Sequence, residues 1–390
     1  MTADLVADAA SLKALCDRVR SAERVGLDTE FHSERTYAPK LMVVQLSFDD
    51  GAVIVDPLAI PDLSPLMEAL DETLIVGHAL SSDLRIFAHR FGHVPKHVFD
   101  CQVAASFLGY GMQISLADLV HDLRNIRLAK TQTVSDWSIR PFSAAQIDYL
   151  VDDVVHLLPM QHQLEERLTT AGRLSWAHEE SDALTDPSKY ERDERRLYLR
   201  IPGAMKMNRR ELGVLFELGK MRDRMASDRD VPPKYILPDD VLGGLATLRP
   251  KREEQLAQLR RLEAGARRSL GSAILEAVAA GEAIPDEDLP QRVPRPLGNA
   301  RETIASLLAV LVGEIAAANQ VPTGLLAPRA TLERVARELP QGIDALRAVL
   351  DLSEWRTALI AEPIYRLLSG QDALRIEGYM DGDPKIRSLT

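Results

Sequence analysis

The chain is poor in cysteine. Two cysteines among 390 residues, Cys16 and Cys101, cannot build a disulfide framework, and no CxxC or Cys/His cluster offers a structural zinc site. Free thiols in this number are typical of proteins from a reducing compartment. We therefore expect a cytoplasmic protein.

Long hydrophobic runs are also absent. The longest apolar stretch covers residues 305–313 and ends at Glu314, whereas a membrane-spanning helix needs roughly 20 apolar residues. The first 20 residues lack a basic start followed by an apolar core, so we expect no secretory signal. These absences predict a protein without a membrane partner.

There is no excess of positive charge. The 47 basic and 58 acidic residues give a formal net charge of −11, which argues against a generally cationic coat for nucleic acid. A local basic groove is still compatible with this net charge, because net charge governs solubility and non-specific binding and does not determine the charge of one site. With 46% hydrophobic and 27% charged residues the composition is globular, and the length suits about two to three domains.

The first half of the chain alternates strand-like and helix-like segments. Strand patterns cover residues 25–31, 41–48, 52–55 and 74–77, and the turn residues Asp49-Asp50-Gly51 predict a hairpin between the second and third. Helical patterns cover residues 12–19, 63–70, 82–91, 99–109, 115–123 and 143–170. This order predicts an α/β domain in which helices flank a mixed sheet.

The second half is helical in pattern and contains an internal repeat. A charged segment at 176–200 predicts an interdomain connector. Beyond it, Pro232 aligns with Pro322 and Leu242 with Leu332, at a constant offset of 90 residues. This offset favours two copies of one small all-α domain over two unrelated bundles. Residues 286–296, rich in proline and charge, form the linker between them.

Two carboxylates lie on one predicted strand. Asp28 and Glu30 are two residues apart, so they project from the same face. Their repulsion is costly unless something neutralises it, and a divalent cation does so. A solvated sheet edge that carries incidental acids is the alternative for this pair alone.

Two further elements carry acids at helical positions. Asp83 lies in the first turn of a helix that follows a strand ending at Gly77, and an acid favoured there by the helix dipole is the simpler interpretation. Tyr149 and Asp153 share a helix face at spacing i, i+4, beside an apolar stripe. A surface tyrosine beside a surface acid is the alternative for that pair.

The combination is more specific than its parts. Asp-x-Glu on a strand, an Asp that opens a helix and Tyr-x-x-x-Asp on a late helix resemble the motifs of DEDD-superfamily 3′→5′ exonucleases. Asp148 stands where the histidine subtype carries its His, so the resemblance is to the tyrosine subtype. The segments LDTEFHSERTYAPKLMVVQLSF, GHALSSDLRIF and KTQTVSDWSIRPFSAAQIDYLVDDVVHLLPM are similar to bacterial ribonuclease D.

The repeated helical unit resembles the HRDC domain, which RecQ-type helicases and ribonuclease D share, present twice. The resemblance implies a ribonuclease H-like α/β exonuclease domain with its connector at 1–190. Two HRDC-type domains would follow at 205–285 and 297–372. A metal-dependent 3′→5′ exoribonuclease that releases nucleoside 5′-monophosphates is the activity it implies.

The resemblance also assigns the site. Asp28, Glu30, Asp83 and Asp153 would hold two divalent cations, Mg²⁺ or Mn²⁺, which prefer oxygen ligands. Tyr149 would orient the attacking water, because a phenol with a pKa of about 10 is a poor base. Candidate substrate contacts are Thr29, Phe31, Gln45, His78, Lys130 and Arg140. Structural alternatives are a core aromatic for Phe31, a hydrogen bond to a backbone carbonyl for His78, and helix packing of Trp137 with Arg140.

The expected partner is RNA with a single-stranded 3′ end, with tRNA precursors as the substrates that the family suggests. Basic residues of the first helical copy, such as Lys206, Arg224 and Lys251, favour contact with phosphates. Interleaved acids make a salt-bridged surface the rival interpretation. A single-stranded DNA exonuclease and a non-catalytic 3′-end-binding adaptor are the alternative functions, and no obligate protein partner is expected.

Overall fold

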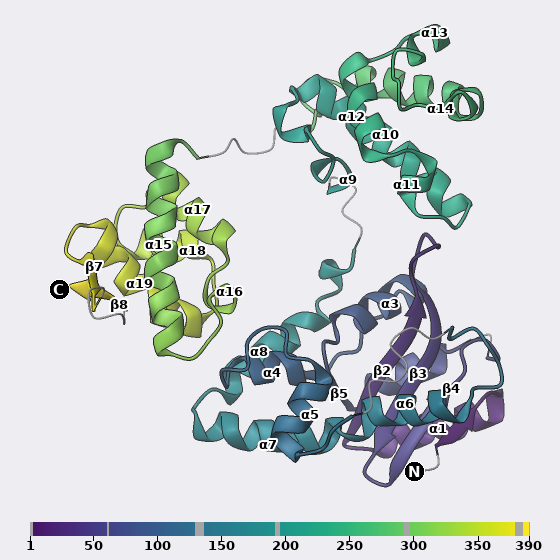
Figure 1. Cartoon of the computed structure of the whole chain (residues 1–390), viewed down its shortest axis with the longest axis vertical. Coiled ribbons are helices and arrows are strands. Elements are labelled where there is room, and N and C mark those ends of the chain that lie inside the picture. Colours follow the sequence, from purple (N-terminus) through teal and green to yellow (C-terminus); the bar gives the residue numbers. More distant parts are fainter. Residues whose placement is uncertain are drawn as a thin grey trace.

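The chain folds into an N-terminal α/β domain followed by two helical units (Figure 1). The computed structural model describes residues 3–60, 62–128, 136–191, 196–291, 297–378 and 385–389. Within these ranges no helix combines the length and the hydropathy needed to cross a membrane.

The N-terminal domain is built on a mixed six-stranded sheet with the order β1-β4-β3-β2-β5-β6. β2 and β3 are antiparallel and so are β3 and β4, whereas the other three pairings are parallel. The strands are β1 (Asp4–Val6), β2 (Arg24–His32), β3 (Lys40–Phe48), β4 (Gly51–Val55), β5 (Leu74–Gly77) and β6 (Val98–Asp100). The predicted hairpin is confirmed, since Phe48 pairs with Gly51.

Helices cover both faces of this sheet. One face packs against α1 (Ala9–Ser21), α2 (Ser64–Leu70) and α3 (Ser81–Phe91). The other face packs against α6 (Ala144–Val155) and α7 (Leu157–Thr170). Three more helices, α4 (Cys101–Ser106), α5 (Leu116–Arg124) and α8 (Leu174–Asp182), pack beside α7.

Two predicted helices are corrected. The segment 143–170 forms two helices that meet at His156, because Pro159 has no N–H to donate to the carbonyl of Val155. The segment 99–109 begins as strand β6, and Asp100 then caps α4 by accepting hydrogen bonds from the N–H groups of Gln102 and Val103. A break at one residue and a strand of three residues leave too little hydrophobic periodicity in the sequence to be detected.

The predicted connector 176–200 is also corrected, because its first part belongs to the α/β domain. α8 buries Ala177 and Ser181 there, and Tyr190 lies in the core beside α3. The Ser181 hydroxyl accepts a hydrogen bond from the N–H of Asp100 at 3.1 Å. A few isolated buried residues anchor this segment, and such anchors produce no apolar stripe in the sequence.

The two helical units repeat the same elements. After α9 (Arg196–Leu199), the first unit contains α10 (Arg209–Asp228), α11 (Pro233–Ile236), α12 (Asp239–Leu248), α13 (Glu253–Leu256) and α14 (Ala264–Ala283). The second contains α15 (Asn299–Ala318), α16 (Thr323–Leu326), α17 (Arg329–Glu338), α18 (Ile343–Leu350) and α19 (Glu354–Leu368). Each helix of the second unit begins 90 residues after its counterpart, as the sequence offset predicts. A hairpin of β7 (Ala373–Glu377) and β8 (Lys385–Leu389), which the sequence analysis missed, follows.

Both helical units contact the α/β domain. The second unit stacks Trp355 on Trp176 of α8, with ring centroids 4.7 Å apart, and its Arg356 forms an ion pair with Glu180 at 2.5 Å. The first unit receives the loop between β2 and β3, which reaches toward it in Figure 1. There the N–H of Tyr37 donates to Asp230 at 3.2 Å, and the Tyr37 hydroxyl donates to Asp223.

Candidate active site

The close approach of α6 to β2 creates the site. A Cβ atom at Gly26 would lie 2.1 Å from the Ser47 hydroxyl oxygen and 3.3 Å from the carbonyl oxygen of Val154. Glycine therefore lets the end of α6 lie directly on the strand, and Ser47 fixes it by donating a hydrogen bond to that carbonyl at 2.8 Å. Because Asp153 precedes Val154, this contact carries its carboxylate to the face that bears Asp28 and Glu30.

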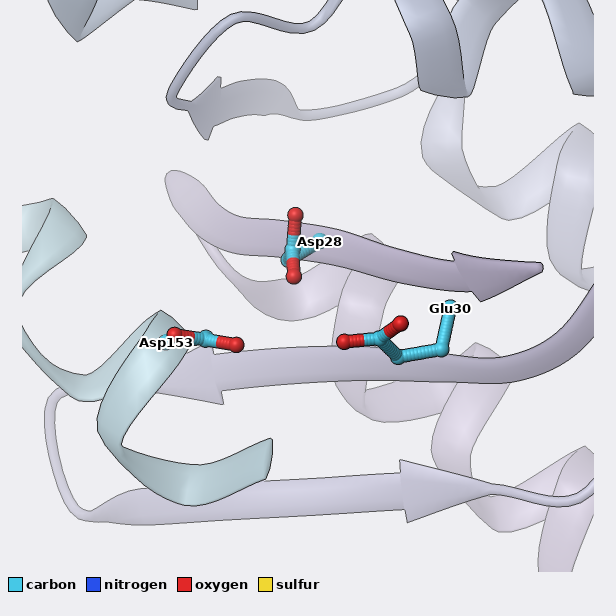
Figure 2. A group of neighbouring side chains, drawn as sticks. All are labelled: Asp28, Glu30 and Asp153. Atoms are coloured by element: carbon cyan, nitrogen blue, oxygen red, sulfur yellow. The ribbon is translucent and has the colours of Figure 1, made fainter. Parts of the chain in front are cut away.

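Three carboxylates meet at this place. Asp28, Glu30 and Asp153 each offer an oxygen atom, and these atoms all lie within 4.8 Å of one another. Figure 2 shows the carboxylates of Glu30 and Asp153 pointing toward one another, with Asp28 beside them. The i, i+2 spacing on the strand thus has the predicted consequence, and the helix supplies the third group.

Asp83 lies next to this group on α3. Its side chain is buried, it accepts a hydrogen bond from the hydroxyl of the buried Thr29, and its charge acts on Asp28. The loop ahead of α3 is fixed by Asp100, which accepts hydrogen bonds from the N–H groups of Ala79 at 3.1 Å and Leu80 at 2.8 Å. The structure therefore places the fourth predicted carboxylate beside the other three, held by the residue between Asp28 and Glu30.

Burial raises the pKa of all four carboxyl groups, and repulsion within the cluster adds to this effect at Asp28 and Glu30. Burial, with the charges of Asp153 and Asp83, raises the pKa of Glu30 to about 8. Burial raises the pKa values of Asp83 and Asp153 to about 7, and it raises that of Asp28 well above its usual range, helped by the three neighbouring acids. At neutral pH such a cluster favours a positive charge in its centre, and oxygen donors at this separation suit a hard divalent cation.

Tyr149 lies at the edge of the cluster and donates a hydrogen bond to Asp153. Burial and the charges of Asp153 and Glu30 raise its pKa above the ordinary value. The phenol therefore stays protonated at neutral pH, which favours the predicted orienting role over that of a base.

A cavity of about 190 Å³ opens beside these groups, and its lining includes Asp28, Asp153, Tyr149 and His78. The His78 ring hydrogen-bonds to the carbonyl of Ile114, and its buried Nε2 has no hydrogen-bond partner among the described residues. Burial lowers the pKa of His78, so the ring is neutral at neutral pH. The ring thus satisfies a backbone carbonyl and also lines the cavity, and the substrate contact stays a prediction.

The other predicted contacts lie in different surroundings. Phe31 is partly buried and packs against the core beneath α1, α2 and α3. Gln45 pairs with Asp28 across the strands but is fully buried, and its amide has no partner within the described part of the chain. Arg140 is engaged by Asp56 rather than directed at the cluster, and Lys130 lies outside the described residues.

Sequence reasoning missed one neighbour of the site, Trp137. Its indole N–H donates a hydrogen bond to Glu30, and its ring centroid lies 5.8 Å from that of Tyr149. The tryptophan in the segment KTQTVSDWSIRP suggested helix packing alone. The contact becomes visible only in the folded chain, where this segment lies close to Glu30 of β2.

Comparisons with known proteins agree with this arrangement. A family model described as 3′-5′ exonuclease matches residues 4–169, and one described as HRDC domain matches residues 211–278. The matched exonuclease region contains all four carboxylates and Tyr149. The class defined by the fold and the site is therefore that of the 3′→5′ exonucleases.

Relatives of similar length narrow this class. Ribonuclease D of Acidiphilium cryptum is 38% identical over 384 residues, covering 96% of this chain and 95% of the relative. The enzyme of Gluconacetobacter diazotrophicus is 37% identical, with the same coverage. The crystal structure of Escherichia coli RNase D, described as an exoribonuclease involved in structured RNA processing, superposes with a TM-score of 0.83 at 27% identity, covering 95% of this chain and 99% of that one. The chain belongs to the ribonuclease D family and is a hydrolytic 3′→5′ exoribonuclease.

Proposed function

We propose that Asp28, Glu30, Asp83 and Asp153 hold two divalent cations, Mg²⁺ or Mn²⁺, and that the site works as the tyrosine subtype of its superfamily. The observation that carries this proposal is the meeting of three carboxylates within 4.8 Å, with Asp83 beside them. The raised pKa values support it, because a bound cation favours the charged carboxylates that burial and, at Asp28 and Glu30, repulsion disfavour.

The reaction is hydrolysis of the last phosphodiester bond of the RNA. A water oxygen forms a bond to phosphorus while the bond from phosphorus to the 3′ oxygen of the penultimate nucleotide breaks. The products are a nucleoside 5′-monophosphate and an RNA that is one nucleotide shorter and ends in a 3′ hydroxyl. The bound cations would activate the water and stabilise the leaving oxygen.

The neighbouring side chains bind and orient the reactants. Tyr149, protonated and anchored to Asp153, presents its phenol oxygen to the attacking water. His78 lines the same cavity and receives the terminal nucleotide. The hydrogen bond from Thr29 fixes Asp83 at the cluster before substrate arrives.

The substrate we infer is RNA with an unpaired 3′ tail, with tRNA precursors among the natural substrates. The structured RNAs named for the Escherichia coli relative support this. Several basic residues of the first helical unit are engaged in ion pairs, including Arg222 with Asp239 inside the unit and Arg210 with Asp286 at the start of the linker. Lys206, Arg224 and Lys251 are exposed and form no ion pair within the described ranges. These three are the candidates for phosphate contact.

We also propose that the second helical unit is a second HRDC-type domain. Its five helices follow the order and the 90-residue offset of the unit that the HRDC family matches. α12 and α17 even end alike, with left-handed residues Arg249 and Leu339 at φ of 48° and 49°. The domain bounds 1–190, 205–285 and 297–372 belong to this proposal.

The test uses 5′-labelled RNA and DNA hairpins, each with the same unpaired 3′ tail, incubated with Mn²⁺ or Mg²⁺. The wild type is compared with Asp153→Asn, and with Asp148→Asn as a matched control on the exposed side of α6. We expect a one-nucleotide ladder on RNA that stops near the stem, lost in Asp153→Asn and retained in Asp148→Asn. A ladder mainly on DNA would show that the substrate is single-stranded DNA instead of RNA. Binding of RNA without any ladder would show that the protein is a non-catalytic adaptor.

A further inference from the structure

A short segment, residues 136–142, packs against β3 and α6 through Trp137 and Phe142. Trp137 is only 4% exposed and lies in a small core with Met42, Val43 and Leu150, which joins β3 to α6. This core adjoins the carboxylate cluster, because Val43 pairs with Glu30 across the strands and Tyr149 packs against the same core. Its packing therefore determines where the groups at the edge of the cluster stand.

Trp137 contacts the site in two ways. Its indole N–H donates a hydrogen bond to the carboxylate of Glu30. Its ring lies beside the ring of Tyr149, with an angle of 36° between the two planes. One side chain thus contacts both a carboxylate of the cluster and the phenol that orients water.

Glu30 needs such support. The pairing of β2 with β3 shifts register between Glu30 and Phe31, so the regular ladder is interrupted at this residue. The charge of Asp153 repels Glu30 as well. Without another contact, a long side chain at an irregular strand position would turn toward solvent.

Arg140 holds Trp137 in place. Its Nε and Nη2 atoms donate to the two carboxylate oxygens of Asp56 at 2.7 and 2.8 Å. Nη1 donates to the carbonyl of Trp137 at 2.7 Å, and Nη2 also donates to the carbonyl of Met42 at 2.9 Å. The guanidinium lies 3.9 Å above the ring of Phe142. This forked pair, with its backbone contacts, ties the segment to β3 and to the end of β4.

We propose that Trp137 is a positioning residue of the metal site, held by Arg140, which sets both the Glu30 carboxylate and the Tyr149 phenol. The inference rests on the proposed function, because it takes the carboxylate cluster as the metal site. Substitution of a residue that orients a metal ligand by a hydrogen bond commonly lowers metal affinity by about 10–100-fold. Removal of the indole N–H should therefore weaken metal binding more than it weakens RNA binding.

The experiment compares Trp137→Phe with Trp355→Phe in the full chain. Both changes replace an indole by a benzene ring, but the N–H of Trp355 is buried without a hydrogen-bond partner in the described structure. Mn²⁺ binding is measured by titration calorimetry without RNA. We expect the apparent Mn²⁺ dissociation constant to rise about 10-fold or more in Trp137→Phe and to stay unchanged in Trp355→Phe.

Kinetics and a second variant separate positioning from packing. At low Mn²⁺ concentration we expect the kcat of Trp137→Phe to lie below the wild-type value and to recover as the Mn²⁺ concentration is raised. The KM for RNA should stay near the wild-type value. Arg140→Lys keeps the charge but loses the forked pair, so it should show a smaller change in the same direction. Thermal unfolding in EDTA reports the packing cost of each change.

Equal Mn²⁺ affinity in Trp137→Phe and the wild type, whether or not the melting temperature falls, would overturn the inference and leave Trp137 a core residue. A failure of the proposed function is distinguishable from this. In that case the wild type itself would bind no Mn²⁺ in the titration and would give no ladder on RNA.

Discussion

At the scale of single residues, the site is a set of acids that the fold forces together. Asp28, Glu30 and Asp153 come within 4.8 Å of one another, and Asp83 is buried beside them. Burial raises the pKa of each, and repulsion within the cluster raises the pKa values of Asp28 and Glu30 further. The buried acids therefore cost stability at a pH where they ionise with no cation to neutralise them.

This cost predicts a pH dependence of stability in EDTA. The folded pKa values of about 7 to 8 for Glu30, Asp83 and Asp153 exceed the ordinary values of 4.5 and 3.8. The folded state therefore holds more protons than the unfolded state between about pH 4 and pH 8. Stability attributable to these groups should fall as pH rises through this window, by about 1.4 kcal/mol per pH unit for each extra proton.

The measurement is thermal unfolding in EDTA from pH 5 to pH 8.5. Asp153→Asn should flatten the decline, since it removes one titrating group and relieves Glu30. Mn²⁺ at pH 8 should raise the melting temperature of the wild type by binding the folded state. A wild-type profile with the slope of Asp153→Asn would contradict the raised pKa values.

Much of this site is predictable from residue spacing. The i, i+2 and i, i+4 spacings are properties of strands and helices, so they are enough to place Asp28 with Glu30, and Tyr149 with Asp153, on shared faces. Trp137 and the clamp of Arg140 on Asp56 could not be predicted. They depend on how one loop lies on a sheet formed more than 80 residues earlier in the chain.

At the scale of elements, the contact between β2 and α6 is decisive. Gly26 leaves the space into which the end of α6 fits, and Ser47 binds the carbonyl of Val154 there. Strand and helix cores were predictable because their apolar periodicity is strong. Element ends were less so: His156 divides one predicted helix, and Val98–Asp100 forms a strand too short to show alternation.

Gly26→Ala should separate these two elements. The added Cβ would meet the Ser47 hydroxyl at 2.1 Å and approach the carbonyl of Val154. We expect a loss of about 1–3 kcal/mol in the free energy of unfolding and a fall in nuclease activity, because Asp153 moves with α6.

The matched control for this change is Gly219→Ala. That glycine lies inside α10, and a Cβ there would be in ordinary contact with Leu197 at 3.5 Å. Alanine favours a helix interior by about 1 kcal/mol over glycine, so stability should hold or rise. Urea unfolding measures both variants, and an unperturbed Gly26→Ala would refute the role of this close approach.

At the scale of the whole molecule, two junctions link the helical units to the exonuclease domain. Trp176 and Trp355 stack where the second unit docks. The loop after β2 inserts Tyr37 against the core of the first unit, so the strand that carries Asp28 and Glu30 also leads to that unit. The repeat was visible in the sequence, but these junctions were not, because single aromatic residues make them.

The Tyr37 junction should matter for structured RNA. In Tyr37→Ala we expect unchanged hydrolysis of a short unstructured oligoribonucleotide. Trimming of a hairpin with a short 3′ tail should become slower, because the first helical unit is no longer held against the exonuclease domain. Tyr235→Ala is the control, because Tyr235 is 61% exposed in the same unit. Equal slowing on both substrates in Tyr37→Ala would show that the loop serves the site itself rather than the junction.

The central claim is that the acid cluster hydrolyses RNA from its 3′ end with divalent cations. Its most direct test is chromatographic identification of the first product released from a single-stranded RNA tail, with Mn²⁺ or with EDTA, by the wild type and by Asp28→Asn. The account predicts nucleoside 5′-monophosphate from the wild type with Mn²⁺ alone, and none from the variant. Release of nucleoside 3′-monophosphates by the wild type would contradict the account. Release of nucleoside 5′-monophosphate by Asp28→Asn in the same amount as by the wild type would also contradict it.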